Sequence, residues 1–371
     1  MRRRQLLTAT GALVLGATLA ACGTSKGAVY KDGQLEMAVI ATYGTGTSTY
    51  ADMAAVANTL TNEKDLNTRI ITSDTAIGRM TPLRKGQATF ARTGDEYIFA
   101  FEGDYDFAAK TWGPQPVRVV WGPTGPHGML VKANSGIVNP EDLKGKKVPR
   151  VTANPSVNNK LQAFLHAGGL TWDDVEPVAI GYGEQAEALK AGKIDVLFQQ
   201  VYGSSLFELE SSTPVRWMTL DKGDEKAIQE IAPSVHLADF GKAPGQKEGE
   251  QQLGMIYAVP VVTYAETPEE IAYALARDFV DTYPKYKDAT ATTQGWSIDA
   301  SMTTPVEVPF HDGMIRLLKE KNHWPAQAQA KQDELLAREG KLAEGWESLG
   351  DIPDDQVPTA WAAWKKEHLD G

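Results

Sequence analysis

Strand-like and helix-like segments alternate along this 371-residue chain from Leu35 onward, and this alternation limits the possible folds more than any other feature. Short apolar runs rich in β-branched residues predict strands, whereas apolar residues three and four positions apart predict helices. Such an alternation indicates α/β sheets wrapped by helices. The expected strands are 35–42, 69–72, 88–92, 117–121, 129–132, 147–151, 178–180, 194–199, 215–220 and 235–238, and the expected helices are 47–60, 76–83, 95–101, 157–167, 184–191 and 268–282. We expect strands 117–121 and 129–132 to pair with each other.

The alternation runs through two sets of elements, which predicts a two-lobed α/β clamshell. Each lobe should contain a mixed sheet wrapped by helices, with a ligand cleft between the lobes. A long apolar run, Met255–Val262, follows the second set and predicts a late return of the chain to the first lobe. The expected divisions are lobe 1 at 33–132, lobe 2 at 133–254, a return to lobe 1 with the hinge at 255–324, and a C-terminal helical extension at 325–371.

The C-terminal extension has apolar residues and tryptophans at helical spacing, which predicts packing across the back of the clamshell. Gly340, Gly345 and Pro353 are expected to interrupt it, so that it does not form one long helix.

The N-terminus combines Arg2 to Arg4, an apolar stretch from Leu6 to Ala20, and Cys22, the single cysteine of the chain. A basic start, an apolar stretch too short to span a bilayer, and small residues before a cysteine are typical of a bacterial lipoprotein signal. We therefore predict a signal peptide at 1–21, a lipid-modified Cys22, and a flexible tether at 22–32. The arginines also suit a twin-arginine signal, so the Sec and Tat export routes both stay open. The protein is expected outside the cytoplasmic membrane, anchored by acyl chains.

The charge of the chain argues against a nucleic-acid partner. Removal of residues 1–21 removes three arginines and no acid, so that the formal net charge falls from −11 to −14. Contacts to phosphate need clustered lysine and arginine, and a strongly acidic body does not supply them.

A loop rich in glycine and hydroxyl side chains follows the first expected strand and precedes the first expected helix. Free backbone N–H groups and the helix dipole favour an anion at such a position, and threonine and serine hydroxyls add donors. A dinucleotide-binding loop is disfavoured because no third glycine stands in register, while a plain tight turn stays open. The candidate ligand-binding residues of this loop are Thr45, Gly46, Thr47 and Ser48.

Five segments, in order over about residues 35–324, resemble the TAXI class of solute receptors of TRAP transporters. The resemblance implies a periplasmic-binding-protein clamshell that captures a small organic anion, such as a carboxylate, an amino acid or a 2-oxo acid. It also implies delivery of that anion to a TRAP membrane permease. The five segments are 42–48, 83–90 with Asp95 downstream, 141–148, 188–195 and 309–314.

The chain departs from the family pattern in the second lobe, where Asn154-Pro155-Ser156-Val157 stands in place of a Gly-Ser-Gly-Thr turn. Pro155 and Val157 remove donors, which leaves Asn154 and Ser156 as candidates. Two arginines near altered turns, Arg92 and Arg150, could supply a planar fork for a carboxylate, although surface salt bridges would also explain them. Further candidates follow a later strand, at Gln199 and Tyr202.

The sequence shows no catalytic or metal-binding spacing among its six histidines and its lone cysteine. We therefore predict a protein that is not an enzyme and that needs no cofactor or metal. Two other hypotheses stay open: a binding lipoprotein of an ABC importer, and an extracytoplasmic enzyme or assembly factor on the same scaffold.

Overall fold

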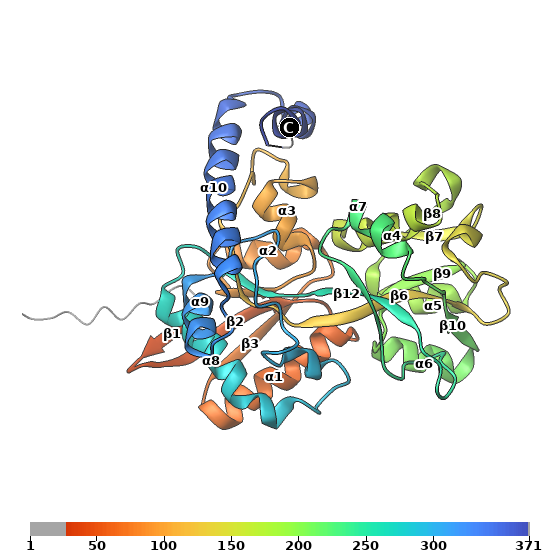
Figure 1. The fold of residues 1–371 in the computed structure, drawn as a ribbon, viewed down its shortest axis with the longest axis horizontal. Coiled ribbons are helices and arrows are strands. Elements are labelled where there is room, and N and C mark those ends of the chain that lie inside the picture. Colours follow the sequence, from red (N-terminus) through yellow and green to blue (C-terminus); the bar gives the residue numbers. More distant parts are fainter. Residues whose placement is uncertain (1–26, 370–371) are drawn as a thin grey trace, which may run out of the picture.

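The computed structural model describes residues 27–369 as two α/β lobes that lie side by side (Figure 1). Lobe 1 contains a mixed sheet, and lobe 2 contains an antiparallel sheet beside a pair of parallel strands. Helices flank the sheets of both lobes, so the predicted two-lobed α/β fold class is confirmed. Within residues 27–369, no helix combines the length and the apolar character needed to cross a membrane.

Lobe 1 is built on a six-stranded sheet. β2 (Gln34–Thr42) is parallel to β3 (Asn67–Thr72) on one side and to β4 (Phe90–Arg92) on the other. Its first half also pairs with the antiparallel β1 (Ala28–Lys31). Beyond β4 the sheet continues through the antiparallel β13 (Val261–Tyr264) to β5 (Val117–Trp121). The helices of this lobe are α1 (Ser48–Lys64), α2 (Ala76–Arg84), α3 (Glu96–Glu102), α8 (Glu269–Tyr286) and α9 (Asp312–Glu320), with short 3₁₀ turns η1 (Tyr105–Phe107) and η5 (Thr293–Trp296).

Lobe 2 contains a five-stranded sheet and a separate pair of parallel strands. β6 (Thr124–Lys132) lies at the centre of the larger sheet and is antiparallel to each of its neighbours. The other strands of that sheet are β9 (Val196–Gln200), β10 (Val215–Trp217), β11 (His236–Asp239) and β12 (Leu253–Ala258), and the parallel pair is β7 (Lys147–Val151) with β8 (Glu176–Ile180). The helices are α4 (Pro155–Ala167), α5 (Gln185–Lys190), α6 (Ser204–Ser212) and α7 (Asp224–Ile231), with 3₁₀ turns η2 (Pro140–Leu143), η3 (Trp172–Asp174) and η4 (Tyr182–Glu184).

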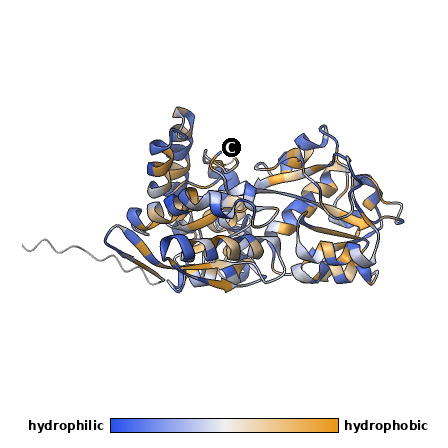
Figure 2. Ribbon diagram, turned by 90° about the horizontal axis from the view of Figure 1, so that it is seen from below, coloured by the Kyte–Doolittle hydropathy of each residue, from blue (hydrophilic) through white to orange (hydrophobic). Residues whose placement is uncertain are grey.

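Each lobe has its own hydrophobic interior, and Figure 2 shows the apolar segments concentrated within the lobes. In lobe 1, side chains such as Ile40, Phe90 and Val262 pack between the sheet and its helices. In lobe 2, Val148, Phe164 and other residues form the larger of two clusters. Burial on this scale is the main stabilising term, and it makes each lobe a compact unit that can support one wall of a cleft.

The chain crosses between the lobes twice, and these crossings correct the predicted divisions. β5 belongs to the sheet of lobe 1 and β6 to that of lobe 2, so the expected pairing of these two segments is wrong. The first crossing is therefore at Gly122–Pro123 rather than after residue 132. The second separates β12 from β13 at Val259–Pro260, within the long apolar run. The Val259 N–H donates to the Pro123 carbonyl at 2.9 Å, and this hydrogen bond joins the two crossings.

The predicted tether also ends earlier than expected. Residues 28–31 form β1, whose pairing with β2 makes them part of the lobe 1 sheet. Ala28 is buried, and exposure increases along the strand to the exposed Lys31. The signal peptide at 1–21, Cys22 and the start of the tether lie outside the described residues.

The C-terminal extension packs on lobe 1, with α10 (Ala326–Ser348) standing beside the lobe and α11 (Val357–His368) lying near α3 (Figure 1). Two bidentate ion pairs attach α10: Arg118 donates to Glu339 at 2.5 and 3.1 Å, and Arg338 donates to Glu102 at 2.7 and 2.9 Å. The Trp361 indole also donates to the Glu102 carbonyl at 2.9 Å. These ion pairs and this hydrogen bond therefore hold the extension against lobe 1.

The prediction that glycines interrupt this extension is wrong, because α10 runs for 23 residues through Gly340 and Gly345. Gly345 lies beneath Trp364, whose ring carbons come within 2.3–2.4 Å of the place that a Cβ would occupy. The missing side chain thus allows α11 to pack closely on α10. Pro353 does separate the two helices, since it precedes the short 3₁₀ turn η6 (Asp354–Gln356).

The two glycines of α10 should respond to alanine in opposite ways. Gly340→Ala is expected to stabilise the protein by about 0.5–1 kcal/mol, because Gly340 is exposed, has no atom near its Cβ position, and gains helix propensity. Gly345→Ala should destabilise it by about 1–3 kcal/mol through overpacking against Trp364. Urea unfolding of both variants checks the pair; equal effects would contradict the close packing of α10 and α11.

Candidate functional site

The two lobes touch each other directly across the cleft. The Ala76 N–H at the start of α2 donates to the Ala153 carbonyl at 3.1 Å, and the Ser204 hydroxyl donates to the Gly46 carbonyl at 2.9 Å. Ser48 at the start of α1 also hydrogen-bonds to Gln200 at the end of β9. These contacts join the helix starts of lobe 1 to the strand and helix ends of lobe 2, and they define the walls of the cleft.

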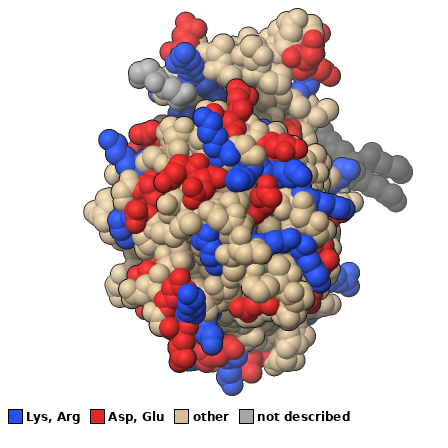
Figure 3. Space-filling model, turned by 90° about the vertical axis from the view of Figure 1, so that its right-hand side faces the viewer, with Lys and Arg blue, Asp and Glu red and all other residues tan. Residues whose placement is uncertain are grey.

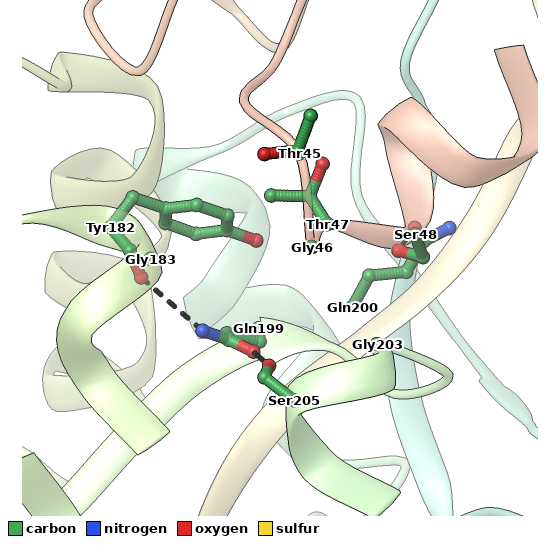
Figure 4. Close-up of a pocket in the computed structure, with 10 residues that line it drawn as sticks. All are labelled: Thr45, Gly46, Thr47, Ser48, Tyr182, Gly183, Gln199, Gln200, Gly203 and Ser205. Atoms are coloured by element: carbon green, nitrogen blue, oxygen red, sulfur yellow. Dashed lines mark hydrogen bonds between the residues drawn. The ribbon is translucent and has the colours of Figure 1, made fainter. Parts of the chain in front are cut away.

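An outer pocket of about 380 Å³ lies where the glycine–threonine loop faces lobe 2 (Figure 4). Gly46 has φ +90°, a backbone conformation that favours glycine, and Thr47 caps α1 by accepting the Tyr50 N–H at 3.1 Å. On the opposite side, Gln199 donates to the Tyr182 carbonyl at 3.2 Å and accepts from Ser205 at 3.1 Å. The lining residues are Thr45, Gly46, Thr47, Ser48, Tyr182, Gly183, Gln199, Gln200, Gly203 and Ser205.

A second, inner cavity lies deeper between the lobes and has room for about one water molecule. Tyr182 lines both spaces, so its ring stands between the outer pocket and the inner cavity. The Tyr43 and Tyr182 rings, one from each lobe, are 5.9 Å apart between centroids. The cavity is lined by Tyr43, Thr49, Gly94, His127, Ser156, Val157, Tyr182, Tyr257 and Val259.

A fully buried ion pair, Arg79 with Glu96, lies behind this cavity in lobe 1. The Arg79 Nε donates to Glu96 Oε1 at 2.5 Å, its Nη1 donates to the Ser73 carbonyl at 3.0 Å, and its guanidinium lies 3.7 Å from the Tyr43 ring centroid. Burial opposes the charge of Arg79, but the neighbouring Glu96 and Tyr43 raise its pKa above the usual value. Burial likewise raises the pKa of Tyr43 well above its usual value, which keeps its hydroxyl protonated.

Several polar atoms around the cavity have no hydrogen-bond partner among residues 27–369. They include Arg79 Nη2 and Glu96 Oε2 from lobe 1 and Asn154 Nδ2 from lobe 2. Asn154 uses its other amide atom to cap α4, since Oδ1 accepts the Val157 N–H at 3.2 Å. A buried polar group without a partner costs about 1–3 kcal/mol, so this concentration of free donors and acceptors distinguishes the site from an ordinary lobe interface.

A second buried ion pair bridges the lobes, between Asp95 of lobe 1 and Lys160 on α4 of lobe 2. The Asp95 N–H also donates to the Ser156 hydroxyl at 2.8 Å. Burial raises the pKa of Asp95, and the ammonium of Lys160 opposes that rise. Lys160 Nζ lies 4.7 Å from the Tyr257 ring centroid, which places this pair at the cavity wall.

A profile of the NMT1-like family matches residues 40–321, which is most of the chain and includes both lobes. The protein belongs to the NMT1-like family.

Solved structures of similar architecture come from several bacteria. The periplasmic aliphatic sulphonate binding protein SsuA from Escherichia coli is 15% identical, covers 88% of this chain and 91% of its own, and has a TM-score of 0.45. A Salmonella typhimurium periplasmic binding protein with high arginine specificity is 13% identical, with coverage of 69% and 100% and a TM-score of 0.43. A putative L-cystine ABC transporter protein from Listeria monocytogenes is also 13% identical, with coverage of 72% and 98% and a TM-score of 0.43.

In this NMT1-like chain, most of the predicted ligand-binding residues lie at the cleft. Ser156 lines the inner cavity, and Asn154 presents its free Nδ2 nearby. Tyr202 lines neither space; it is half-buried and packs against the smaller core cluster of lobe 2, with its hydroxyl near Gly241. The predicted residues at the outer pocket are Thr45, Gly46, Thr47, Ser48 and Gln199.

The two arginines predicted to bind the ligand, Arg92 and Arg150, have other partners in the structure. Arg92 is 2% exposed and forms an ion pair with Asp52, and its guanidinium lies 4.7 Å from the Trp296 ring centroid within lobe 1. Arg150 is exposed on β7 and lies over the Trp172 ring at 4.3 Å. The Arg92 side chain is buried in the core of lobe 1, whereas the Arg150 side chain is exposed to solvent.

The buried ion pair Arg79–Glu96 was not predicted from the sequence, although both residues lie close to segments that resemble the family. Arg79 and Glu96 stand on the buried faces of the short helices α2 and α3, where the sequence pattern favours apolar residues. Ionisable residues at core positions were the available signal, because such residues are almost never fully buried unless they are paired.

Charges of both signs are interspersed on the outer face of lobe 2, as Figure 3 shows. The buried charges of the cleft are therefore a separate feature from the solvated charges of the surface.

His127 on β6 contributes to the pH dependence of stability. Burial is the main cause that lowers its pKa to about 3; Lys160 and Arg92 lower it further, against a hydrogen bond to the Gly125 carbonyl. Its ring stacks on Tyr257 at 4.2 Å. Between about pH 3 and 6.5 the unfolded chain therefore binds a proton at this residue that the folded chain does not.

We expect His127→Gln to reduce the loss of stability on acidification. Relative to the variant, the wild type should lose about 2 kcal/mol between pH 7 and pH 5, because a depressed histidine pKa disfavours the folded state as pH falls below 6.5. Urea unfolding at both pH values gives the difference, and the comparison with the variant cancels the carboxylates. If the difference in the free energy of unfolding between wild type and variant does not change with pH, a neutral, buried His127 is contradicted.

Proposed function

We propose that this protein is an extracytoplasmic solute receptor that closes its two lobes around a small organic solute bearing an anionic group. The observation that carries the proposal is that buried polar atoms of both lobes have no hydrogen-bond partner among residues 27–369: Arg79 Nη2 and Glu96 Oε2 in lobe 1, and Asn154 Nδ2 in lobe 2. A ligand that pairs with them removes a desolvation cost that the closed lobes otherwise bear. The candidate classes are a carboxylate, an amino acid and a 2-oxo acid.

The donors around the cleft suit an acid group. Arg79 offers a guanidinium N–H, Asn154 an amide N–H, and the start of α1 lies at the outer pocket with its N-terminal dipole. The two lobes contribute different donors, so full pairing needs lobe closure. This arrangement supports capture and release by hinge motion at the crossings Gly122–Pro123 and Val259–Pro260.

A thermal-shift screen of organic acids, followed by calorimetry, tests the proposal. A ligand at 100 times its Kd should stabilise the protein by about 2.7 kcal/mol. Asn154→Ser should weaken binding about 10-fold because it removes Nδ2 but keeps an oxygen to cap α4. Asn134→Ser, at an exposed turn of lobe 2, is the matched control. A screen without any binder would contradict the receptor function.

The membrane partner we propose is a TRAP-type permease, supported by the five segments that resemble TAXI receptors. An ABC importer is the alternative partner, because the fold of a receptor does not by itself decide which permease it serves. Co-reconstitution in vesicles separates the two. Uptake driven by an ion gradient supports a TRAP-type partner, whereas uptake that requires ATP hydrolysis supports an ABC importer. An extracytoplasmic enzyme would instead convert the ligand, which calorimetry samples reveal by mass spectrometry.

Cys22→Ser is expected to release the mature protein from the membrane without changing its free energy of unfolding. A lipid anchor contributes attachment to the membrane, so its loss should leave the packing of residues 27–369 unchanged. Membrane fractionation after signal cleavage provides the measurement. A cleaved variant that remains on the membrane like the wild type would contradict the proposed lipid anchor.

A further inference from the structure

We propose that closure of the two lobes is coupled to the uptake of one proton by Glu307, so that the closed form is favoured as the pH falls. Glu307 belongs to a segment of lobe 1 that lies against β5, where the Val119 N–H donates to the Pro309 carbonyl at 3.0 Å. Its side chain lies near the interlobe ion pair of Asp95 and Lys160. The inference goes beyond the proposed receptor function, because it concerns how the lobes close and not which solute they hold.

The carboxyl group of Glu307 is enclosed where the two lobes meet. Its Oε2 atom is buried and has no hydrogen-bond partner among residues 27–369, although the residue as a whole is only half-buried. From lobe 2, Ser234 forms a side-chain hydrogen bond with Glu307. An ionised carboxylate with one oxygen buried and unpaired is costly. Because Ser234 belongs to the other lobe, separation of the lobes breaks this contact and admits water to the carboxyl group.

The interlobe cluster of Asp95, Glu307 and Lys160 contains two acids and one base. The ammonium of Lys160 forms its ion pair with Asp95, where the two side chains are 1% and 4% exposed. The other hydrogen bond described for this ammonium goes to Asn159 Oδ1 at 3.4 Å, and the Tyr257 ring centroid lies 4.7 Å away. Lys160 is therefore committed to Asp95, and a proton on Glu307 removes the excess negative charge of the cluster.

The other ionisable groups around Glu307 do not supply the missing positive charge. Glu102, at the end of α3, adds a further acid, which is matched by cations of the C-terminal extension. Tyr97, on the same helix, stays neutral because burial raises its pKa well above the usual value. His127 lies near Lys160 in lobe 2, and burial lowers its pKa to about 3, so it is also neutral at pH 7.

The direction of the pH dependence follows from this environment. The pKa of Glu307 is raised to about 7, mainly by burial and also by Asp95, while Lys160 and the hydrogen bond with Ser234 oppose the rise. In the open form water solvates the carboxyl group, and its pKa returns toward the ordinary 4.5. Between about pH 4.5 and 7 the closed form therefore binds a proton that the open form does not. The ratio of closed to open forms should be about tenfold higher at pH 6 than at pH 8.

Two measurements on the ligand-free protein, with the proton as the only probe, test the coupling. An NMR titration of the glutamate carboxyl carbons follows Glu307 directly, and Glu307→Gln identifies its signal by removing it. We expect this signal to titrate near pH 7.

Small-angle scattering at pH 6 and pH 8 then follows lobe closure. The wild type should be more open at pH 8, with a closed-to-open ratio about tenfold lower than at pH 6. Glu307→Gln copies the protonated carboxyl group, so it should be as closed at pH 8 as at pH 6. Glu344→Gln, at an exposed position of α10, is the matched control and should keep the wild-type pH dependence.

Three results would overturn the proposal. A Glu307 signal that titrates near pH 4.5 means that the carboxyl group is solvated. Scattering that is the same at both pH values, with Glu307 titrating near pH 7, means that its burial is not coupled to closure. A folded Glu307→Gln protein that keeps the wild-type change in scattering assigns the proton to another group. None of these measurements uses an organic solute, so the acid screen decides the receptor function separately.

Discussion

Arg92→Met is expected to destabilise lobe 1 by about 3–5 kcal/mol, whether or not a ligand is present, because it leaves Asp52 as an unpaired charge in the core. Asp52 is fully buried, and beyond Arg92 it accepts only from the Thr292 hydroxyl at 3.2 Å and the Trp296 indole at 3.1 Å among the bonds described for it. Neutral donors do not replace a guanidinium. The same arginine also donates to the carbonyls of Thr49 at 3.0 Å and Val259 at 3.3 Å.

Urea unfolding of Arg92→Met, with Arg150→Ala as the control, measures this effect. Arg150 is exposed and stacks on Trp172, so its loss should cost no more than about 1 kcal/mol. Both arginines lie in strands, Arg92 at the end of β4 and Arg150 within β7, yet the expected losses of stability differ several-fold. A stable Arg92→Met protein that had lost only ligand binding would instead support the original expectation of a ligand-binding arginine.

Lys160→Met is expected to shift the protein toward an open arrangement and to weaken ligand binding by about 100-fold or more. Lys160 and Asp95 are 1% and 4% exposed where the lobes meet, so removal of the ammonium leaves a buried carboxylate in the closed form. When the lobes separate, water can solvate Asp95, and the penalty of about 3–5 kcal/mol falls on the closed form alone. A ligand that binds only the closed form then loses affinity in proportion to the closed fraction.

Small-angle scattering of the ligand-free protein and calorimetry with the best ligand from the screen test the lobe-closing role. Lys193→Met, an exposed lysine of the same lobe, should change neither measurement. Asp95→Asn combined with Lys160→Met should recover part of the closed population, because the buried charge is then removed. Unchanged scattering and affinity in Lys160→Met would contradict a role for this ion pair in closure.

The sequence predicted the local elements well because the signals that set them lie close together in the chain. The first expected strand at 35–42 is β2 (Gln34–Thr42), and the helix expected from 47 is α1, capped by Thr47. Where a signal was ambiguous, the element changed: the strand expected at 215–220 ends at Trp217, as β10 (Val215–Trp217). Apolar periodicity and caps act over a few residues, so they could be read without the fold.

The candidate site was predicted only in part, for the same reason. The glycine–threonine loop at 44–48 could be identified because a strand, a flexible turn and a helix start follow one another directly. Arg79 and Glu96 are 17 residues apart, and their pairing depends on how α2 packs beside α3. Arg92 was assigned to the ligand because its strand ends near the cleft, while Asp52, its actual partner, lies 40 residues earlier.

What the sequence by itself determined is therefore the class of fold, the order of its elements and one loop of the cleft. Only the tertiary structure decided that β5 and β6 belong to different lobes, that the chain crosses between the lobes at two places, and that α10 runs unbroken beneath Trp364. It also decided which buried charges are paired within a lobe and which bridge the lobes. Burial and charge pairing are properties of contacts between distant segments, and a buried charge is stable only where such a contact supplies its partner.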